Sequence, residues 1–306
     1  MSAEPPAPAR GERASRALAS LRGLAVGDAL GSQFSVPGNH ALPRGRALPP
    51  GPWRWTDDTE MACSLVAVLG ARGEADQDAL AASFAEHHDV ERGYGPAVHR
   101  MLRQIRQEDG DWRELAAALF GGQGSWGNGA AMRVAPLGAW FAGDAGRAAE
   151  EAERSAGVTH RHPEAVAGAR AVAAAASLVA GGPKRDGAQL LDSVQELVPR
   201  SAVRAGLRRA ADMLDYADVA TVAAVLGCGR RTSAHDTVPF TLWAAARHPG
   251  DFREAVWATA RAGGDTDTTC AIVGGIVAAG GHAAAPPREW AERTEELPAW
   301  LTASLT

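Results

Sequence analysis

The chain has 306 residues, of which 46% are hydrophobic and 22% are charged, a composition typical of a globular protein with a sizeable core. Its net charge of -5 and a pI near 6.0 argue against broad binding to nucleic acids or to anionic membranes. The three cysteines form no CxxC pair, which favours buried thiols in a reducing compartment over a disulfide or zinc framework. Because the sequence lacks the pattern of a signal peptide or of an uninterrupted membrane span, we expect a cytoplasmic protein with no membrane contact.

Helical periodicity begins after a short tail and continues to the end of the chain. Residues 1–12 are rich in Pro, Ala and Arg and are expected to be disordered, whereas residues 13–306 are expected to form a single domain. Helices are predicted from about residue 18 into the Gly-Asp-Ala-Leu-Gly segment 27–31, and then near residues 57–71, 78–88, 96–107, 111–120, 144–157, 164–180, 187–198, 201–215, 218–226, 237–247, 252–262, 268–280 and 288–296. Alternating β-branched segments are nearly absent, so the predicted fold class is all-α.

Two short acidic clusters lie near opposite ends of the chain, and each comes just before an apolar helical run. They are Thr56-Asp57-Asp58-Thr59 and Gly263-Gly264-Asp265-Thr266-Asp267-Thr268. Bringing their four carboxylates together costs free energy through like-charge repulsion unless cations lie between them. The ligand set is all oxygen, which suits Mg2+ or Mn2+, and such a set can hold two ions side by side. The clusters can share one site only if the helices fold into one compact body.

Helix capping is the alternative explanation of these clusters, because Asp and Thr commonly begin helices. A single tetrad of this kind is more often a cap than a metal site. Two matching clusters reverse that balance, and the glycine pair 263–264 lets the backbone come close to a ligand. We therefore favour a metal site formed by both clusters.

Two further segments fit a ligand-binding role less specifically. Small residues in Ser125–Arg133 let backbone N–H groups line a surface suited to phosphate, although glycines before a helix more often form a turn. Trp126 within this loop can stack on a base or be a core aromatic. At a predicted helix start, His160 and His162 suit either hydrogen bonding to a ribose or phosphate or a plain helix-entry turn. The sequence contains no serine-hydrolase, P-loop or zinc-protease motif.

The order and spacing of these segments resemble those of the ADP-ribosylglycohydrolase family, which includes the dinitrogenase reductase-activating glycohydrolase, from about residue 20 to 281. The segments are Gly27–Gly31, Trp55–Thr59, Gly127–Arg133, Thr159–His160 and Gly263–Thr268. The resemblance implies a compact orthogonal multi-helix bundle with a binuclear Mg2+ or Mn2+ centre in a cleft. It also implies hydrolysis of the glycosidic bond at C1″ of ADP-ribose.

The same resemblance implies roles for individual residues. The implied metal ligands are Thr56, Asp57, Asp58, Asp265, Asp267 and Thr268. The implied catalytic carboxylates are Asp57, Asp58 and Asp265. The implied contacts to the substrate come from Trp126, Gly127, Asn128, Gly129, Met132 and His160. Asp28 looks structural and is expected to anchor the helix end beside the site.

One position departs from the family pattern. Many relatives have a glutamate four residues after the last glycine of segment 27–31, where this chain has Ser35. The general base then falls to Asp57, Asp58 or a water activated by the metal, and the favoured substrate becomes ADP-ribosylated arginine on proteins.

Three other functions compete with that one. They are an ADP-ribose-binding protein with weak or no activity, a hydrolase of O-linked (serine or nucleic-acid) ADP-ribose, and a two-metal phosphoesterase that attacks phosphorus. The expected partner is an ADP-ribosylated protein or small molecule, and the expected state is a monomer.

Overall fold

Helices account for the regular structure of this chain. The computed structural model describes residues 9–301, and within that range it has no strand and only two isolated β-bridges, Trp53–Thr294 and Gly127–Ser233. Sequence rich in alanine and leucine, with few β-branched runs, explains this, since such residues lose little side-chain entropy in a helix. The predicted all-α class is confirmed.

The α-helices range from single turns to the 24 residues of the first one. In chain order they are α1 (Arg10–Gln33), α2 (Leu42–Gly45), α3 (Asp57–Arg72), α4 (Gln77–Glu86), α5 (Pro96–Glu108), α6 (Trp112–Ala118), α7 (Ala135–Trp140), α8 (Ala145–Gly157), α9 (Pro163–Ala180), α10 (Gly187–Leu197), α11 (Ala202–Asp212), α12 (Val219–Leu226), α13 (Ala234–Arg247), α14 (Phe252–Ala262), α15 (Thr266–Ala278) and α16 (Arg288–Ala291). Short 3-10 turns lie between some of them, at η1 (Val90–Arg92), η2 (Asn128–Ala130) and η3 (His282–Ala284).

Some boundaries differ from those that the sequence predicts. Helix α1 begins at Arg10, so residues 10–12 of the expected tail belong to a helix, and residues 1–8 lie outside the described range. Helix α7 has no counterpart among the predicted helices, because it is short and buried on every side and so lacks a polar face. Helix α2 also has no counterpart among the predicted helices, because the sequence around it is rich in Pro, Gly and Arg.

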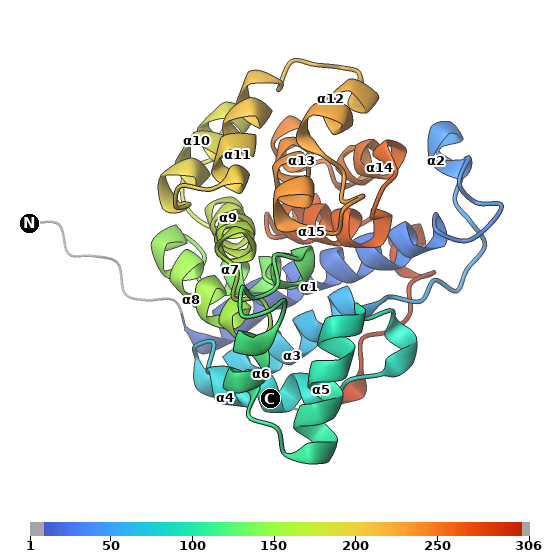
Figure 1. Ribbon diagram of the computed structural model, residues 1–306. Coiled ribbons are helices and arrows are strands. Elements are labelled where there is room, and N and C mark those ends of the chain that lie inside the picture. Colours follow the sequence, from blue (N-terminus) through green and yellow to red (C-terminus); the bar gives the residue numbers. More distant parts are fainter. Residues whose placement is uncertain (1–8, 302–306) are drawn as a thin grey trace, which may run out of the picture.

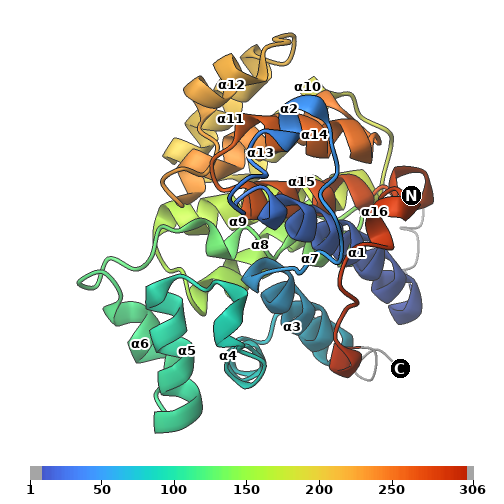
Figure 2. The same cartoon turned by 90° about the vertical axis from the view of Figure 1, so that its right-hand side faces the viewer.

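Helix α1 lies directly against α15, and the contact is made by backbone as much as by side chains (Figure 2). Gly23, Gly27 and Gly31 are spaced four residues apart and therefore line one face of α1. A Cβ atom at Gly27 would overlap the carbonyl oxygen of Cys270, and one at Gly31 would overlap that of Thr266. The missing side chains let the antiparallel helices approach closely, which brings the C-terminal end of α1 to the N-terminal end of α15.

Other helices enclose this pair in steeply crossing layers. Helices α3, α7, α9, α13 and α14 pack on α1, on α15 or on both. Figure 1 views α9 along its axis while α1 and α15 run across the view, with α10–α12 on one side of them and α4–α6 on the other. One cluster of buried hydrophobic residues extends from Ala17 to Leu301. The predicted orthogonal bundle is confirmed.

Helix α9 is the one described helix whose length and apolar character would suffice to cross a membrane. It packs against α7, α8 and α13, and 61% of it is buried inside the protein. Burial in the core of the bundle therefore accounts for its apolar sequence.

Replacing Gly27 by alanine should destabilise the protein by about 3 kcal/mol, because the added Cβ collides with a backbone carbonyl that is itself held in a helix. Gly11→Ala in the same helix is the matched control, since nothing lies within 4 Å of its added Cβ and alanine has the better helix propensity. Urea unfolding followed by circular dichroism measures both variants. Equal stability of Gly27→Ala and Gly11→Ala would contradict the close approach of α1 and α15.

Candidate active site

Helix α3 begins at the first acidic cluster, and a buried aspartate from α1 holds its first turn. Asp28 accepts hydrogen bonds from Thr56 N (2.9 Å), Thr56 Oγ1 (2.8 Å) and Thr59 Oγ1 (2.6 Å). Burial raises the pKa of Asp28 to about 7, against the opposing effect of the Thr59 hydrogen bond. Asp28 thus anchors the start of α3 against α1, the structural role expected of it.

Neither acidic cluster works as an ordinary helix cap. The N-cap residues of α3 and α15, Thr56 and Asp265, make no capping hydrogen bond with their side chains. The N-cap aspartates of α4, α6, α8, α10, α12 and α14 all make such a bond. In α3, Asp28 accepts from the backbone N–H groups of Thr56 and Thr59 and so replaces the local cap. The capping explanation of the two clusters is therefore wrong.

The second cluster is fixed by contacts from distant segments. Asp265 N donates to Cys228 O (3.1 Å), and Asn128 Nδ2 donates to Asp265 Oδ2 (2.7 Å). Thr266 Oγ1 donates to Gly31 O (2.9 Å) at the end of α1. The start of α15 is thus tied both to α1 and to the glycine-rich loop that carries Asn128.

The two clusters meet beside the α1–α15 contact. Thr268 Oγ1 lies 3.4 Å from Asp58 Oδ2, although the two residues are 210 positions apart. Burial raises the pKa of Asp58, and the charges of Asp28 and Asp57 raise it further. Burial, followed by the charge of a cluster neighbour, also raises the pKa of Asp265 to about 7. Carboxylates from both ends of the chain therefore share one poorly solvated region.

This group of carboxylates has the character of a cation site. Asp58 is 1% exposed, and its Oδ1 has no hydrogen-bond partner in the part of the chain that the structure describes. Among residues 9–301, no arginine, lysine or histidine forms an ion pair with Asp28 or with a cluster aspartate. An unpartnered buried carboxylate oxygen and uncompensated negative charge are both costly, and a divalent cation with oxygen ligands relieves both. The residues present therefore fit the predicted metal.

The ligand geometry is not preformed. Within the described part of the chain, no group of three or more His, Cys, Asp or Glu side chains is already spaced to hold a metal ion. Asn128 engages Asp265, while Thr56 and Thr268 engage Asp58. We expect the binding of ions to turn these side chains, and the binuclear centre stays a prediction.

A cleft of about 410 Å³ opens beside the carboxylates. The residues predicted to contact the substrate all line it, namely Trp126, Gly127, Asn128, Gly129, Met132 and His160. From the acidic clusters it is lined by Asp57, Asp265, Asp267 and Thr268. Thr56 and Asp58, the other predicted ligands, do not line it. The structure thus brings the loop, the histidine and both clusters to one place.

The glycine loop packs on the His160 ring at van der Waals distance. A Cβ atom at Gly129 would lie 2.9 Å from His160 Nε2, and one at Gly127 would lie 3.2 Å from it. A side chain at either position would therefore push the loop away from the ring and narrow the cleft.

The two histidines of segment 159–163 have different surroundings. Burial, followed by the charge of the buried Arg133, lowers the pKa of His160 to about 3, and its Nδ1 lies 2.7 Å from Thr159 Oγ1. The ring is therefore neutral at pH 7 and can hydrogen-bond a ligand. His162 caps α9 by accepting from Glu164 N (3.1 Å), so the helix-entry interpretation is correct for His162.

Other cleft residues have no clear signal in the sequence. Phe120 and Trp126 are both exposed, and their rings are nearly parallel with centroids 6.2 Å apart. Gly93, Gly95 and Thr232 also line the cleft, from segments whose composition indicates only turns. Of these residues, Trp126 alone is among the substrate contacts predicted from the sequence. The others reach the cleft through the tertiary fold.

Ser35, at the position where many relatives have a glutamate, is exposed just after the end of α1. Its N–H donates to Ser32 O (3.2 Å), and the residue does not line the cleft. Among the described residues, the cluster aspartates therefore supply the carboxylates of the cleft wall, and Ser35 is not part of that wall.

The chain matches known proteins along nearly its whole length. A sequence model of the ADP-ribosylglycohydrolase family matches residues 9–305. The chain belongs to this family. It is 27% identical to ADP-ribosylhydrolase ARH3 of Homo sapiens across 92% of this chain and 89% of that protein. It is 26% identical to ADP-ribosylarginine hydrolase Tri1 of Pseudomonas putida (strain GB-1) across 91% of this chain and 74% of that protein.

A solved structure agrees with this family assignment. A chain described as an ADP-ribosylglycohydrolase-related protein complex has a TM-score of 0.66 and 27% identity, covering 96% of both chains. The predicted family, the predicted fold and the predicted enzyme class, an ADP-ribosylglycohydrolase, are confirmed.

The buried His160 should make the protein less stable as the pH falls. The pKa of His160 is about 3 in the folded protein and about 6.5 in the unfolded chain, so between these values only the unfolded state gains the proton. Stability attributable to the neutral ring should therefore be full above pH 6.5 and fall by about 2 kcal/mol by pH 5. Urea unfolding at both pH values measures the loss, and His160→Gln should show a correspondingly smaller one. An identical pH dependence in the two proteins would contradict the buried neutral ring.

Proposed function

We propose that this chain is a Mg2+- or Mn2+-dependent hydrolase that releases ADP-ribose from ADP-ribosylated arginine on proteins. The observation that carries the proposal is the single cleft that joins an aromatic pair, a glycine loop with a neutral histidine, and acids from both ends of the chain. We assign the aromatic pair to the base, the glycine loop to the diphosphate and the acids to the distal ribose of ADP-ribose.

The base end of the cleft is aromatic. Trp126 and Phe120 present exposed, nearly parallel rings on which adenine can stack. His162 meets the Trp126 ring edge-on at 5.6 Å between centroids, which fixes the orientation of the indole.

In this proposal the diphosphate binds at the glycine loop. Gly127 and Gly129 let the loop lie close on the neutral His160 ring, and we assign the phosphate oxygens to this surface. Arg133 ends the loop, is fully buried, and donates to Gly129 O (3.2 Å) and Ser155 O (2.7 Å). It holds the loop in shape and places a positive charge behind it.

The distal ribose lies at the acidic end. The residues that would hold the cations are Thr56, Asp57, Asp58, Asp265, Asp267 and Thr268. Bound there, divalent cations supply Lewis acidity toward the ribose hydroxyls and toward water. The cluster carboxylates themselves stabilise positive charge that develops at C1″ as the glycosidic bond breaks.

Asp57 and Asp265 are the better general bases of the three predicted catalytic carboxylates. Both line the cleft, where a carboxylate can reach a water molecule beside C1″ of the bound ribose. Asp58 is buried and does not line the cleft, which suits a ligand more than a base.

The favoured leaving group is guanidine. An arginine linked to ADP-ribose carries its own positive charge and departs as a neutral guanidine, so the enzyme need not protonate it. A serine oxygen would need a proton donor, and the carboxylic acids among the described residues that line the cleft are aspartates that are also needed near the ribose. The name of the relative Tri1, an ADP-ribosylarginine hydrolase, agrees with this choice.

Asp265→Asn and Asp57→Asn should each slow ADP-ribose release by at least about a thousandfold, because each removes a base and a cation ligand. Neither variant should unfold, since losing one of several repelling charges relieves the metal-free cluster. Asp215→Asn, at an exposed position that does not line the cleft, is the matched control.

The assay measures free ADP-ribose released from arginine-linked, serine-linked and nucleic-acid-linked substrates, with Mg2+ and with a chelator. Release from the arginine linkage alone is the expected result. Release from serine or nucleic acid instead would indicate the O-linked hydrolase, AMP among the products would indicate a phosphoesterase, and tight binding without release would indicate a binding protein. Near-wild-type turnover in Asp265→Asn would contradict the catalytic and metal-binding roles proposed for the cluster aspartates.

Mg2+ or Mn2+ should raise the melting temperature of the metal-free protein. The ions bind the folded cluster and not the dispersed acids of the unfolded chain, which stabilises the fold by about 2.7 kcal/mol at a hundred times Kd. Asp267→Asn should shrink this shift, and a chelator should reverse it. Thermal scans in which neither ion shifts the wild type would count against a metal-dependent enzyme.

A further inference from the structure

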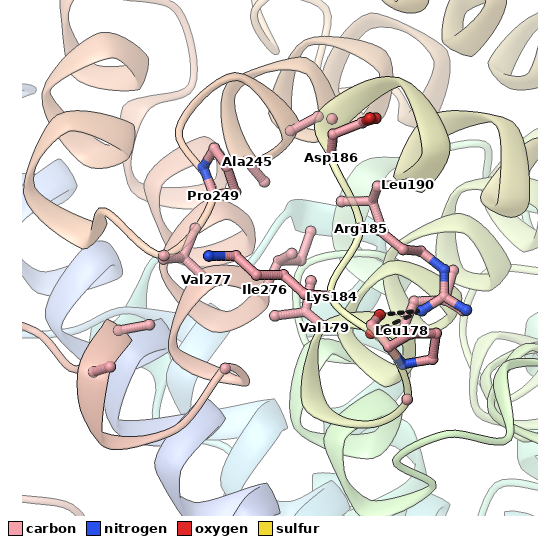
Figure 3. Close-up of a pocket in the computed structure, with 18 residues that line it drawn as sticks. Leu178, Val179, Lys184, Arg185, Asp186, Leu190, Ala245, Pro249, Ile276 and Val277 are labelled. Carbon is pink, nitrogen blue, oxygen red and sulfur yellow. Dashed lines mark hydrogen bonds between the residues drawn. The ribbon is translucent and has the colours of Figure 1, made fainter.

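A second cavity, of about 340 Å³, lies outside the cleft described above (Figure 3). It is enclosed by the end of α9 and the loop after it, the start of α10, the segment around Pro249 after α13, and the end of α15. Its volume falls within the range of small-molecule pockets.

The walls of this cavity are mainly apolar. The side chains that line it include Leu178, Val179, Leu190, Ala245, Ile276 and Val277. The first residue of α10, Gly187, lies so close to α13 that a Cβ atom there would overlap Ala246 O. Close contact of this kind between helices limits how far they can move to fill the cavity.

The mouth of the cavity carries positive charge that no acid neutralises. Lys184, the only lysine of the chain, extends across the cavity in Figure 3 with its ammonium on the side of Pro249 and Val277. Among the described residues it has no hydrogen bond and no ion pair. Arg185 donates only to backbone, to Leu178 O (3.4 Å) and Pro183 O (3.2 Å).

Among the described residues that line the cavity there is one carboxylate, and it already accepts a hydrogen bond. Asp186 accepts from Gln189 N (2.8 Å) and forms the capping box of α10. Two cations and one committed acid leave the mouth with an excess of positive charge.

We propose that this cavity binds a small amphiphilic anion, a carboxylate of about eight carbons in all. The tail fills the apolar cavity, and the carboxylate pairs with the Lys184 ammonium at the mouth, with Arg185 beside it. The binding needs both parts, because the lining of the cavity is mainly apolar and its two cations outnumber its one acid.

The proposed site is separate from the active site. Helix α15 connects the two, since Asp267 lies in its first turn and Ile276 near its end. Nine residues along a helix span about 14 Å. Occupation of the cavity therefore does not require an intact cleft, and the proposal does not rest on the proposed function.

Calorimetric titration of the full chain with octanoate tests the proposal, with octylammonium and hexanoate as comparison ligands. Octanoate should bind with one-to-one stoichiometry, octylammonium at least about tenfold more weakly because its charge is opposite, and hexanoate about tenfold more weakly because it lacks two methylenes. Equal affinity for octanoate and octylammonium would overturn the proposal.

Lys184→Met keeps the apolar stem and removes the charge, and it should weaken octanoate binding at least tenfold. Arg103→Met on the distant helix α5 changes the net charge equally at an exposed residue and should leave the affinity unchanged.

Val179→Trp should fill the cavity and abolish binding, while ADP-ribose added to the wild type should not displace octanoate. Unchanged binding in Lys184→Met, or displacement by ADP-ribose, would place octanoate elsewhere and end the proposal.

Discussion

Helix α1 approaches α15 to backbone distance because Gly23, Gly27 and Gly31 face it without side chains. This approach has a chemical consequence as well as a packing one. The antiparallel pair brings the end of α1 to the start of α15, where Thr266 Oγ1 bonds to Gly31 O. Asp28, one turn earlier on α1, then holds the start of α3 by its backbone N–H groups and hydroxyls. Both acidic clusters are thus placed by one helix, and a displacement of α1 would separate them.

The same arrangement concentrates negative charge in a poorly solvated place. Asp28 and the cluster aspartates repel one another, and burial raises the pKa of several of them. A protein selected for stability alone would replace some of these acids, because an unpaired buried carboxylate is costly. Their retention together fits a site in which divalent cations supply the missing charge. Asn128 of the glycine loop donates a hydrogen bond to Asp265. This bond connects the predicted phosphate contacts to the predicted metal ligands.

Much of the fold and of the candidate site can be predicted from local sequence patterns. The all-α class and most helices follow from periodicity and composition, and the acidic clusters, the glycine loop and His160 follow from short motifs. What the sequence does not reveal depends on contacts between distant segments. The roles of Gly23 and Gly27 depend on which helix lies opposite them, and Phe120 reaches the cleft only through the tertiary fold. Helix α7 is buried on every side and so has no amphipathic period. Lys184 is an ordinary loop residue in the sequence, and only the surrounding helices place it at the mouth of a cavity.

The central claim is that the first and second acidic clusters together hold divalent cations beneath a bound ribose. Anomalous diffraction from crystals grown with Mn2+ tests it most directly, because the anomalous signal locates the metal independently of the protein atoms. The account predicts two peaks between the start of α3 and the start of α15, within about 2.0–2.3 Å of oxygens from Asp57, Asp58, Asp265 and Asp267. A map at saturating Mn2+ with no peak there, and with these carboxylates directed away from one another, would contradict it.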